Sequence, residues 1–240
     1  MESLTDKPMI ELIYSVVFWA IAIVSSILQD RHPDAGVASY QTFIKAVPTL
    51  SAMIFTLYSF SVLSGTLFGT FYMILGVALF FCMLGDIAME KDLVPGIGMF
   101  LVAHLIFTVN FLWQASLLTP NFTNMIIAIV CFGGFVAYVF IYIRYLRSSG
   151  PEIPPFILKA GLFYFILVSA TIGSSLLLWL TSMTVMGFIP FVGAVFFIIS
   201  DSIIALNEFH HKLSRPELLI MPTYYVAIFL LSLGAIAYLF

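Results

Sequence analysis

The chain has 240 residues, of which 62% are hydrophobic and only 9% charged, and its mean hydropathy is +1.13. Soluble domains carry about 25% charged residues, so this composition excludes a soluble enzyme and indicates an integral membrane protein. The net charge of −3 gives no support for binding nucleic acid. Cys82 and Cys131 both lie in apolar stretches, which argues against a disulfide or a zinc ligand set.

Apolar stretches long enough to cross a bilayer recur along the whole chain. A helix needs roughly 20 apolar residues to span the hydrocarbon core. The pattern predicts an all-α polytopic membrane protein, a single domain over residues 1–240 built as a bundle of eight transmembrane helices. The first stretch has no cleavage signal and is predicted to be a retained helix. The predicted spans are 10–28, 43–62, 70–89, 94–116, 122–143, 156–180, 185–206 and 218–239.

Polar residues interrupt several of these spans. Lys45 enters at the start of the second span, Asp86 lies near the end of the third, and His104 lies within the fourth. The fifth follows the glycosylation sequon at Asn121. A carboxyl group costs about 2.5–3.5 kcal/mol at bilayer depth on insertion scales, so an intramembrane aspartate indicates a function.

The last two spans carry the second group of polar residues. Ser200 and Asp201 lie in the seventh span, Asn207 follows its end, and Tyr224 and Tyr225 lie in the first turns of the eighth. The two aspartates are 115 positions apart, and each follows Phe at −5 and a small residue at −1. These matches hint at a parallel repeat of four plus four helices, which would place the aspartates across a pseudo-two-fold axis.

Basic residues are distributed unevenly between the two predicted faces. Eight of the nine lie at one face, and Lys7 alone lies at the other. Because positive charge favours the cytosolic side, this face is predicted to be cytosolic and both termini extracytosolic. At 1.5 Å per residue, Asp86 lies about 6 Å and Asp201 about 9 Å inside the cytosolic face, and His104 lies about 15 Å inside it. Lys45, Asp86, His104, Asp201 and Asn207 are therefore expected to line one cavity open to the cytosol or the inner leaflet.

Two nearby carboxylates in a pocket of low dielectric can share a proton, so that one acts as an acid and the other as a base. Simpler interpretations stay open for each residue. Asp86 is also suited to pairing with a lysine at the interface, and Asp201 to a hydrogen bond between helices. His104 fits a packed, hydrogen-bonded side chain, and Lys45 fits an interfacial anchor.

Five motifs contain most of these polar residues: Phe43-Ile44-Lys45 with Pro48, Leu84-Gly85-Asp86, Ala103-His104, Gly193-Ala194-x-x-Phe197-x-x-Ser200-Asp201-Ser202, and Met221-Pro222-Thr223-Tyr224-Tyr225-Val226-Ala227. Together they resemble the lysoplasmalogenase family, also called the YhhN or transmembrane protein 86 family, from about position 40 to the C-terminus. One position departs from the pattern, because the chain has Ile228 where a Gln is expected.

The resemblance implies hydrolysis of the vinyl ether bond of a lysoplasmalogen to a fatty aldehyde and glycerophosphoethanolamine or glycerophosphocholine. It implies Asp86 and Asp201 as the catalytic pair, with no metal or other cofactor. Lys45 is expected to bind the substrate phosphate, while His104, Asn207, Ser200, Tyr224 and Tyr225 are expected to orient water or the headgroup. The expected partners are the lysophospholipid and membrane lipid. The expected location is the endoplasmic reticulum, with the site toward the cytosol.

Two other functions stay open. A transporter or channel would use the two aspartates to bind a cation or relay protons. A structural or regulatory membrane protein would keep the fold without catalysis, and Ile228 keeps this alternative open. Aldehyde release from a lysoplasmalogen distinguishes the enzyme from both.

Overall fold

The computed structural model describes residues 7–31, 39–63, 65, 67–149 and 153–237. All regular secondary structure among them is helical, and the eight helices are α1 (Lys7–Arg31), α2 (Ser39–Leu63), α3 (Leu67–Met89), α4 (Leu93–Leu117), α5 (Phe122–Ser149), α6 (Pro155–Ser182), α7 (Val185–Phe209) and α8 (Glu217–Ala237). Each is long and apolar enough to cross a membrane. The predicted all-α bundle of eight transmembrane helices is therefore confirmed. Parts of the predicted breaks, at 32–34, 64 and 150–151, and the end of the eighth span at 238–239 lie outside the described residues.

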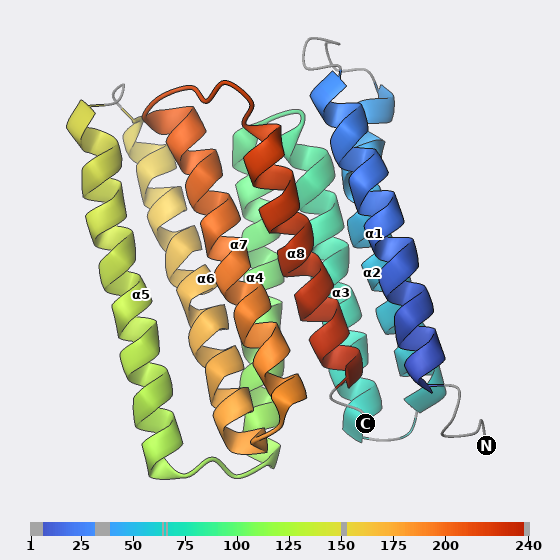
Figure 1. Cartoon of the computed structure of the whole chain (residues 1–240). Helices are drawn as coiled ribbons and strands as arrows, with labels where there is room; N and C mark the ends of the chain where they lie inside the picture. The colour runs from blue at the N-terminus through green and yellow to red at the C-terminus, as the bar shows by residue number, and fades with distance from the viewer. Residues whose placement is uncertain (1–6, 32–38, 64, 66, 150–152, 238–240) are drawn as a thin grey trace.

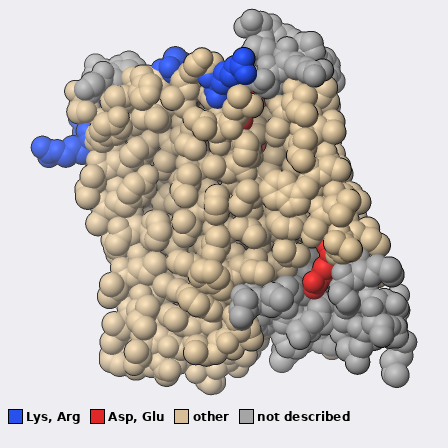
Figure 2. Space-filling view, viewed as in Figure 1, with Lys and Arg blue, Asp and Glu red and all other residues tan. Residues whose placement is uncertain are grey.

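Successive helices run in opposite directions, so α1 begins and α8 ends at the same end of the bundle (Figure 1). On the face drawn in Figure 2, the Lys and Arg side chains lie toward the other end, where α1 ends and α2 begins. This distribution agrees with the charge asymmetry of the sequence. That this end faces the cytosol stays a prediction.

The helix pairing agrees with a repeat of four plus four helices. In each half, every helix packs on the next: α1 on α2, α2 on α3 and α3 on α4, then α5 on α6, α6 on α7 and α7 on α8. The halves meet where α4 packs on α6 and where α8 packs on α2. In a four-plus-four repeat α4 corresponds to α8 and α6 to α2, so these two pairings are equivalent. Three further contacts, α1 on α8, α3 on α8 and α5 on α7, have no such counterpart among the described residues.

Close helix approach and a short turn fix the elements around the polar residues. A Cβ at Gly193 of α7 would lie 3.0 Å from the backbone nitrogen of Leu231 and 3.1 Å from the carbonyl oxygen of Ala227, so only glycine permits this contact with α8. This glycine thus lets α7 and α8 pack closely together. We call the end of the bundle where α1 ends and α2 begins the basic end. There, Asp92 accepts a hydrogen bond from the backbone nitrogen of Val94 at 2.9 Å and so begins α4 directly after α3.

Candidate active site

A small hollow lies at the basic end of the bundle, where α3, α4, α6 and α7 meet. Its volume is about 60 Å³, which is room for a few water molecules. Its lining is apolar apart from two side chains, Asp201 and Tyr164. The full lining is Met89, Leu93, Ile97, Phe100, Ile157, Gly161, Tyr164, Phe165, Asp201, Ile204, Ala205 and Phe209.

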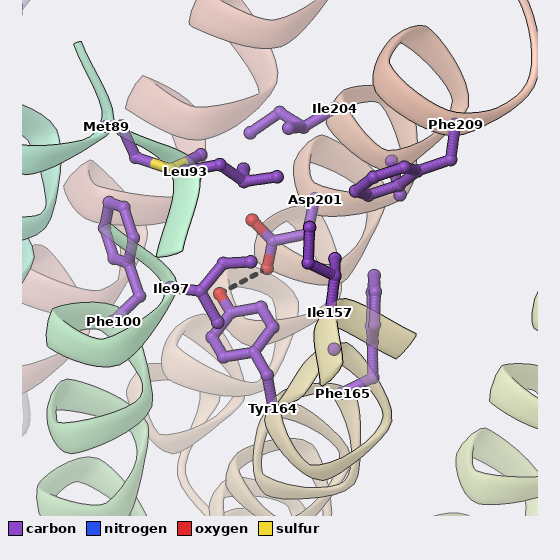
Figure 3. A pocket seen from close by; sticks show the side chains of 12 residues that line it. Met89, Leu93, Ile97, Phe100, Ile157, Tyr164, Phe165, Asp201, Ile204 and Phe209 are labelled. Carbon is purple, nitrogen blue, oxygen red and sulfur yellow. Dashed lines mark hydrogen bonds between the residues drawn. The ribbon is translucent and has the colours of Figure 1, made fainter. Parts of the chain in front are cut away.

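Asp201 projects from α7 into this hollow (Figure 3). The hydroxyl of Tyr164, on α6, donates a hydrogen bond to its Oδ2 at 2.6 Å. Asp201 is 9% exposed, whereas Asp86 is only 1% exposed. A carboxyl group in such surroundings loses most of its hydration, so its proton and its charge depend on the few groups that contact it.

Asp86 lies on α3 and does not line the hollow. Its Oδ2 accepts a hydrogen bond from the hydroxyl of Thr49 on α2 at 2.7 Å, and that hydroxyl lies 3.4 Å from the hydroxyl of Tyr224 on α8. Its Oδ1 is buried and has no hydrogen-bond partner among the described residues. Thr49 is therefore the nearest donor to Asp86, the Tyr224 hydroxyl also interacts with this carboxyl group, and Oδ1 is left to take up a proton or a water molecule.

Three aromatic rings link the two carboxylates. Phe100 lines the hollow of Asp201 and packs edge to face on Phe197 and on Tyr224, each with ring centroids 5.9 Å apart. The ring centroids of Phe197 and Tyr224 are 5.4 Å apart. The hydrogen bonds of the described residues do not join Asp86 to Asp201 directly, and each carboxylate has a hydroxyl donor of its own.

One buried thiol lies within electrostatic reach of both carboxylates. The Cys82 thiol is buried and interacts electrostatically with both of them. Next to Asp86, a Cβ at Gly85 would lie 2.8 Å from the ring of Phe100, so glycine is what lets that ring sit against α3. Phe100 thus lines the hollow of Asp201 and also packs against α3 beside Asp86.

Lys45 carries its own carboxylate partner in the structure. Its Nζ lies 2.9 Å from Oε1 of Glu90, and the lysine side chain is only 13% exposed. Glu217 and Asp86 add further negative charge around the ammonium group. A phosphate would have to exchange with Glu90 to reach Lys45. Neither Lys45 nor Glu90 lines the hollow, although Glu90 directly follows Met89, which does.

His104 is buried between α4 and α6. Its Nδ1 lies 3.0 Å from the hydroxyl oxygen of Thr171, and its Nε2 is buried without a hydrogen-bond partner among the described residues. The imidazole packs edge to face on Phe197 at 4.5 Å and on Tyr164 at 5.7 Å between ring centroids. It therefore supports the two rings that flank Asp201 and lies outside the hollow's lining.

The remaining predicted residues contact backbone rather than the hollow. The Ser200 hydroxyl donates to the carbonyl of Ile220 on α8 at 3.2 Å, and the Tyr225 hydroxyl donates to the carbonyl of Lys45 at 3.2 Å. Asn207 accepts a hydrogen bond from the backbone nitrogen of Leu213 at 2.9 Å and so holds the turn after α7. Of the five residues expected to line one cavity, Asp201 alone lines this hollow.

Thr49 and Tyr164 were missed at the sequence level, although a signal was present. They are 115 positions apart, the same spacing as Asp86 and Asp201, so the repeat relates both members of each pair. Ile228, the departure from the expected motif, is fully buried on α8 and does not line the hollow. Ile228 therefore contributes nothing to the surface of the hollow.

In the part of the chain that the structure describes, no three His, Cys, Asp or Glu side chains lie close enough together to hold a metal ion. The arrangement around Asp201 is instead that of a single carboxyl group, held by one hydroxyl donor, at the inner end of an apolar hollow. Such a group can donate a proton to an apolar substrate or take one from water.

Comparison with known proteins agrees with the motifs. Neither the curated proteins nor the solved structures gave a match to the chain. The sequence model of the YhhN family matches residues 40–235, a stretch that contains both carboxylates, both hydroxyl donors and all the other residues of the candidate site. Because the match covers most of the chain, the resemblance is confirmed, and this eight-helix membrane protein belongs to the YhhN family.

Proposed function

We propose that this chain is a lysoplasmalogenase, which hydrolyses the vinyl ether bond of lysoplasmenylethanolamine or lysoplasmenylcholine. The products are a fatty aldehyde and glycerophosphoethanolamine or glycerophosphocholine. The observation that carries the proposal is the position of Asp201, a carboxyl group at the inner end of a hollow that is otherwise apolar except for Tyr164. An alkenyl ether has an apolar chain next to a carbon that can accept a proton. The apolar lining of the hollow suits the chain, and Asp201 suits the carbon.

The reaction needs one proton donor and one water molecule. The protonated carboxyl of Asp201 gives its proton to the alkene carbon that does not carry oxygen, and the ether carbon becomes an oxocarbenium ion. Water adds to that carbon and returns a proton to the Asp201 carboxylate. The resulting hemiacetal then collapses, its hydroxyl proton moving to the glycerol oxygen as the carbon–oxygen bond breaks. Each turnover therefore consumes one water molecule and leaves Asp201 protonated, as it was at the start.

Asp86 takes part as the second carboxylate of the predicted pair. Because it does not line the hollow, its part is to stabilise the cation by charge through the intervening rings rather than by contact. The headgroup is proposed to lie at the rim beside Met89, where a zwitterion exchanges partners with the Lys45–Glu90 ion pair. Its phosphate meets Lys45 while its ammonium group meets Glu90. No metal or cofactor enters this scheme.

The experiment is aldehyde release by the purified protein in detergent. With lysoplasmenylethanolamine as the substrate, we expect fatty aldehyde and glycerophosphoethanolamine in equal amounts. The saturated ether analogue, which has no alkene carbon to protonate, is the control and should give no product. An inactive wild-type protein would refute the enzyme. Ion or solute flux through proteoliposomes without aldehyde release would favour the transporter instead.

We further propose that the protein resides in the endoplasmic reticulum with the hollow facing the cytosol. The uneven distribution of basic residues supports this orientation. Epitope tags at both termini test it. They should become accessible to antibody only when the organelle membrane is permeabilised as well as the plasma membrane, and access through the plasma membrane alone would reverse the orientation.

A further inference from the structure

The same hydroxyl–carboxylate pair occurs once in each half of the chain. In the first half Thr49 of α2 donates to Oδ2 of Asp86 on α3, and in the second half Tyr164 of α6 donates to Oδ2 of Asp201 on α7. The two members of each pair are 37 residues apart in both halves. The side chains differ in size and chemistry, and what both halves share is a hydroxyl donor on one oxygen of a buried carboxyl group.

The pair in the second half has a further property, because Asp201 and Tyr164 both line the hollow. The Tyr164 hydroxyl occupies Oδ2 of Asp201 at 2.6 Å, and the second oxygen points away from Tyr164, toward Leu93 (Figure 3). A hydroxyl that donates to one carboxyl oxygen leaves the acid proton to the other oxygen. The two oxygens of Asp201 are thus made unequal by one contact.

We infer that Tyr164 is a positioning residue that keeps the acid proton on Oδ1 of Asp201 and holds that oxygen toward the substrate. This inference rests on the proposed function. In each turnover the proton leaves Oδ1 for the alkene carbon, and Tyr164 keeps its own proton throughout. The hydroxyl donates to Oδ2 in both protonation states of Asp201, and this bond strengthens when the carboxylate becomes charged as the cation forms.

The test is Tyr164→Phe beside Tyr142→Phe. The hydroxyl of Tyr142, on α5, donates to the backbone carbonyl of Ser202 at 2.5 Å, one residue beyond Asp201, and does not contact the Asp201 carboxyl. Both variants therefore lose one tyrosine hydroxyl that bonds to the same stretch of α7. For Tyr164→Phe we expect kcat to fall about 10- to 100-fold with KM within about twofold, the loss of a hydrogen bond to a charged group. For Tyr142→Phe both constants should stay within about twofold of wild type.

An infrared measurement checks the contact without relying on activity. With ¹³C in the aspartate side-chain carboxyls, the carboxyl band of the protein should shift in Tyr164→Phe and stay in place in Tyr142→Phe. If Tyr164→Phe does not fold, 3-fluorotyrosine at position 164 keeps the ring and supplies a more acidic hydroxyl, and the same band should shift.

Equal kcat for the two Phe variants, or an unshifted band at position 164, would overturn the inference. A shifted band in a protein that releases no aldehyde would support the positioning of the carboxyl group and refute the reaction assigned to it. The failure of the inference and the failure of the proposed function therefore give different results.

Discussion

Replacing each aspartate by asparagine separates the two carboxylates by the size of their effects. Asn keeps the shape of Asp, and its amide oxygen still accepts the hydroxyl of Tyr164 at position 201 or of Thr49 at position 86. Both variants are therefore expected to fold. An amide, however, cannot give up a proton to carbon, so Asp201→Asn removes the acid from the hollow while leaving its lining intact.

The structure predicts a larger loss of rate for Asp201→Asn than for Asp86→Asn. General acid catalysis contributes about 10²- to 10⁴-fold, so Asp201→Asn should raise the barrier by about 2.7–5.4 kcal/mol. Asp86 acts only through its charge. At an effective dielectric of about 20, two charges about 4 Å apart interact by about 4 kcal/mol, and the energy falls with distance. Because Asp86 does not line the hollow, a smaller loss than for Asp201→Asn, about tenfold in rate or about 1.4 kcal/mol, is expected for Asp86→Asn.

The assay is the initial rate of aldehyde release, with the aldehyde trapped as its hydrazone, at saturating lysoplasmenylethanolamine. Thermal unfolding in the same detergent controls for folding. A loss of equal size in the two variants would refute the division of roles. A rate for Asp201→Asn within about tenfold of wild type would refute Asp201 as the acid.

Three further results are expected. Dialysis against a chelator should leave the rate unchanged, and a loss of activity that zinc restores would contradict the metal-free scheme. Lys45→Gln should raise KM severalfold with little change in kcat. Lys212→Gln, which breaks an exposed ion pair with Glu208 at 3.0 Å, should change neither constant, and equal effects would contradict the placement of Lys45 in the headgroup site. Gly193→Ala should lower the free energy of unfolding by about 1–3 kcal/mol in detergent, because the new methyl group meets the backbone of α8. Gly98→Ala, where a Cβ meets nothing within 4 Å, should be neutral or stabilising, and similar losses at both positions would contradict the close packing of α7 on α8.

The fold was predictable because a chain that crosses a bilayer must form long apolar helices. The lengths of the apolar stretches and the polar breaks between them can be read directly from the sequence. The small residues Gly193 and Ala194 are a sequence signal for close helix approach, and Gly193 indeed meets the backbone of α8. That α8 is the helix it meets was not predictable. The neighbour of a helix depends on how the helices are arranged in the bundle, and hydropathy carries no information about that arrangement.

The site was predictable in residue type and depth but not in its contacts. Depth along a helix follows from the rise per residue, so Asp86 and Asp201 were expected near one face. Rotation about the helix axis decides which neighbour a side chain meets, and the structure separates the two carboxylates by donor and by exposure. Tyr164 carried no motif of its own. Its only sequence signal is that it lies 115 positions after Thr49, the same spacing as between Asp86 and Asp201. The two hydrogen bonds are needed to recognise that spacing as significant.

The most direct test of the central claim is hydrolysis of lysoplasmenylethanolamine in heavy water enriched in ¹⁸O, followed by mass spectrometry of both products. Protonation of the alkene carbon by Asp201 predicts one deuterium on the carbon next to the aldehyde group. Addition of water to the ether carbon predicts glycerophosphoethanolamine without ¹⁸O. An aldehyde without deuterium, or ¹⁸O in the glycerophosphoethanolamine, would contradict acid catalysis at the vinyl ether.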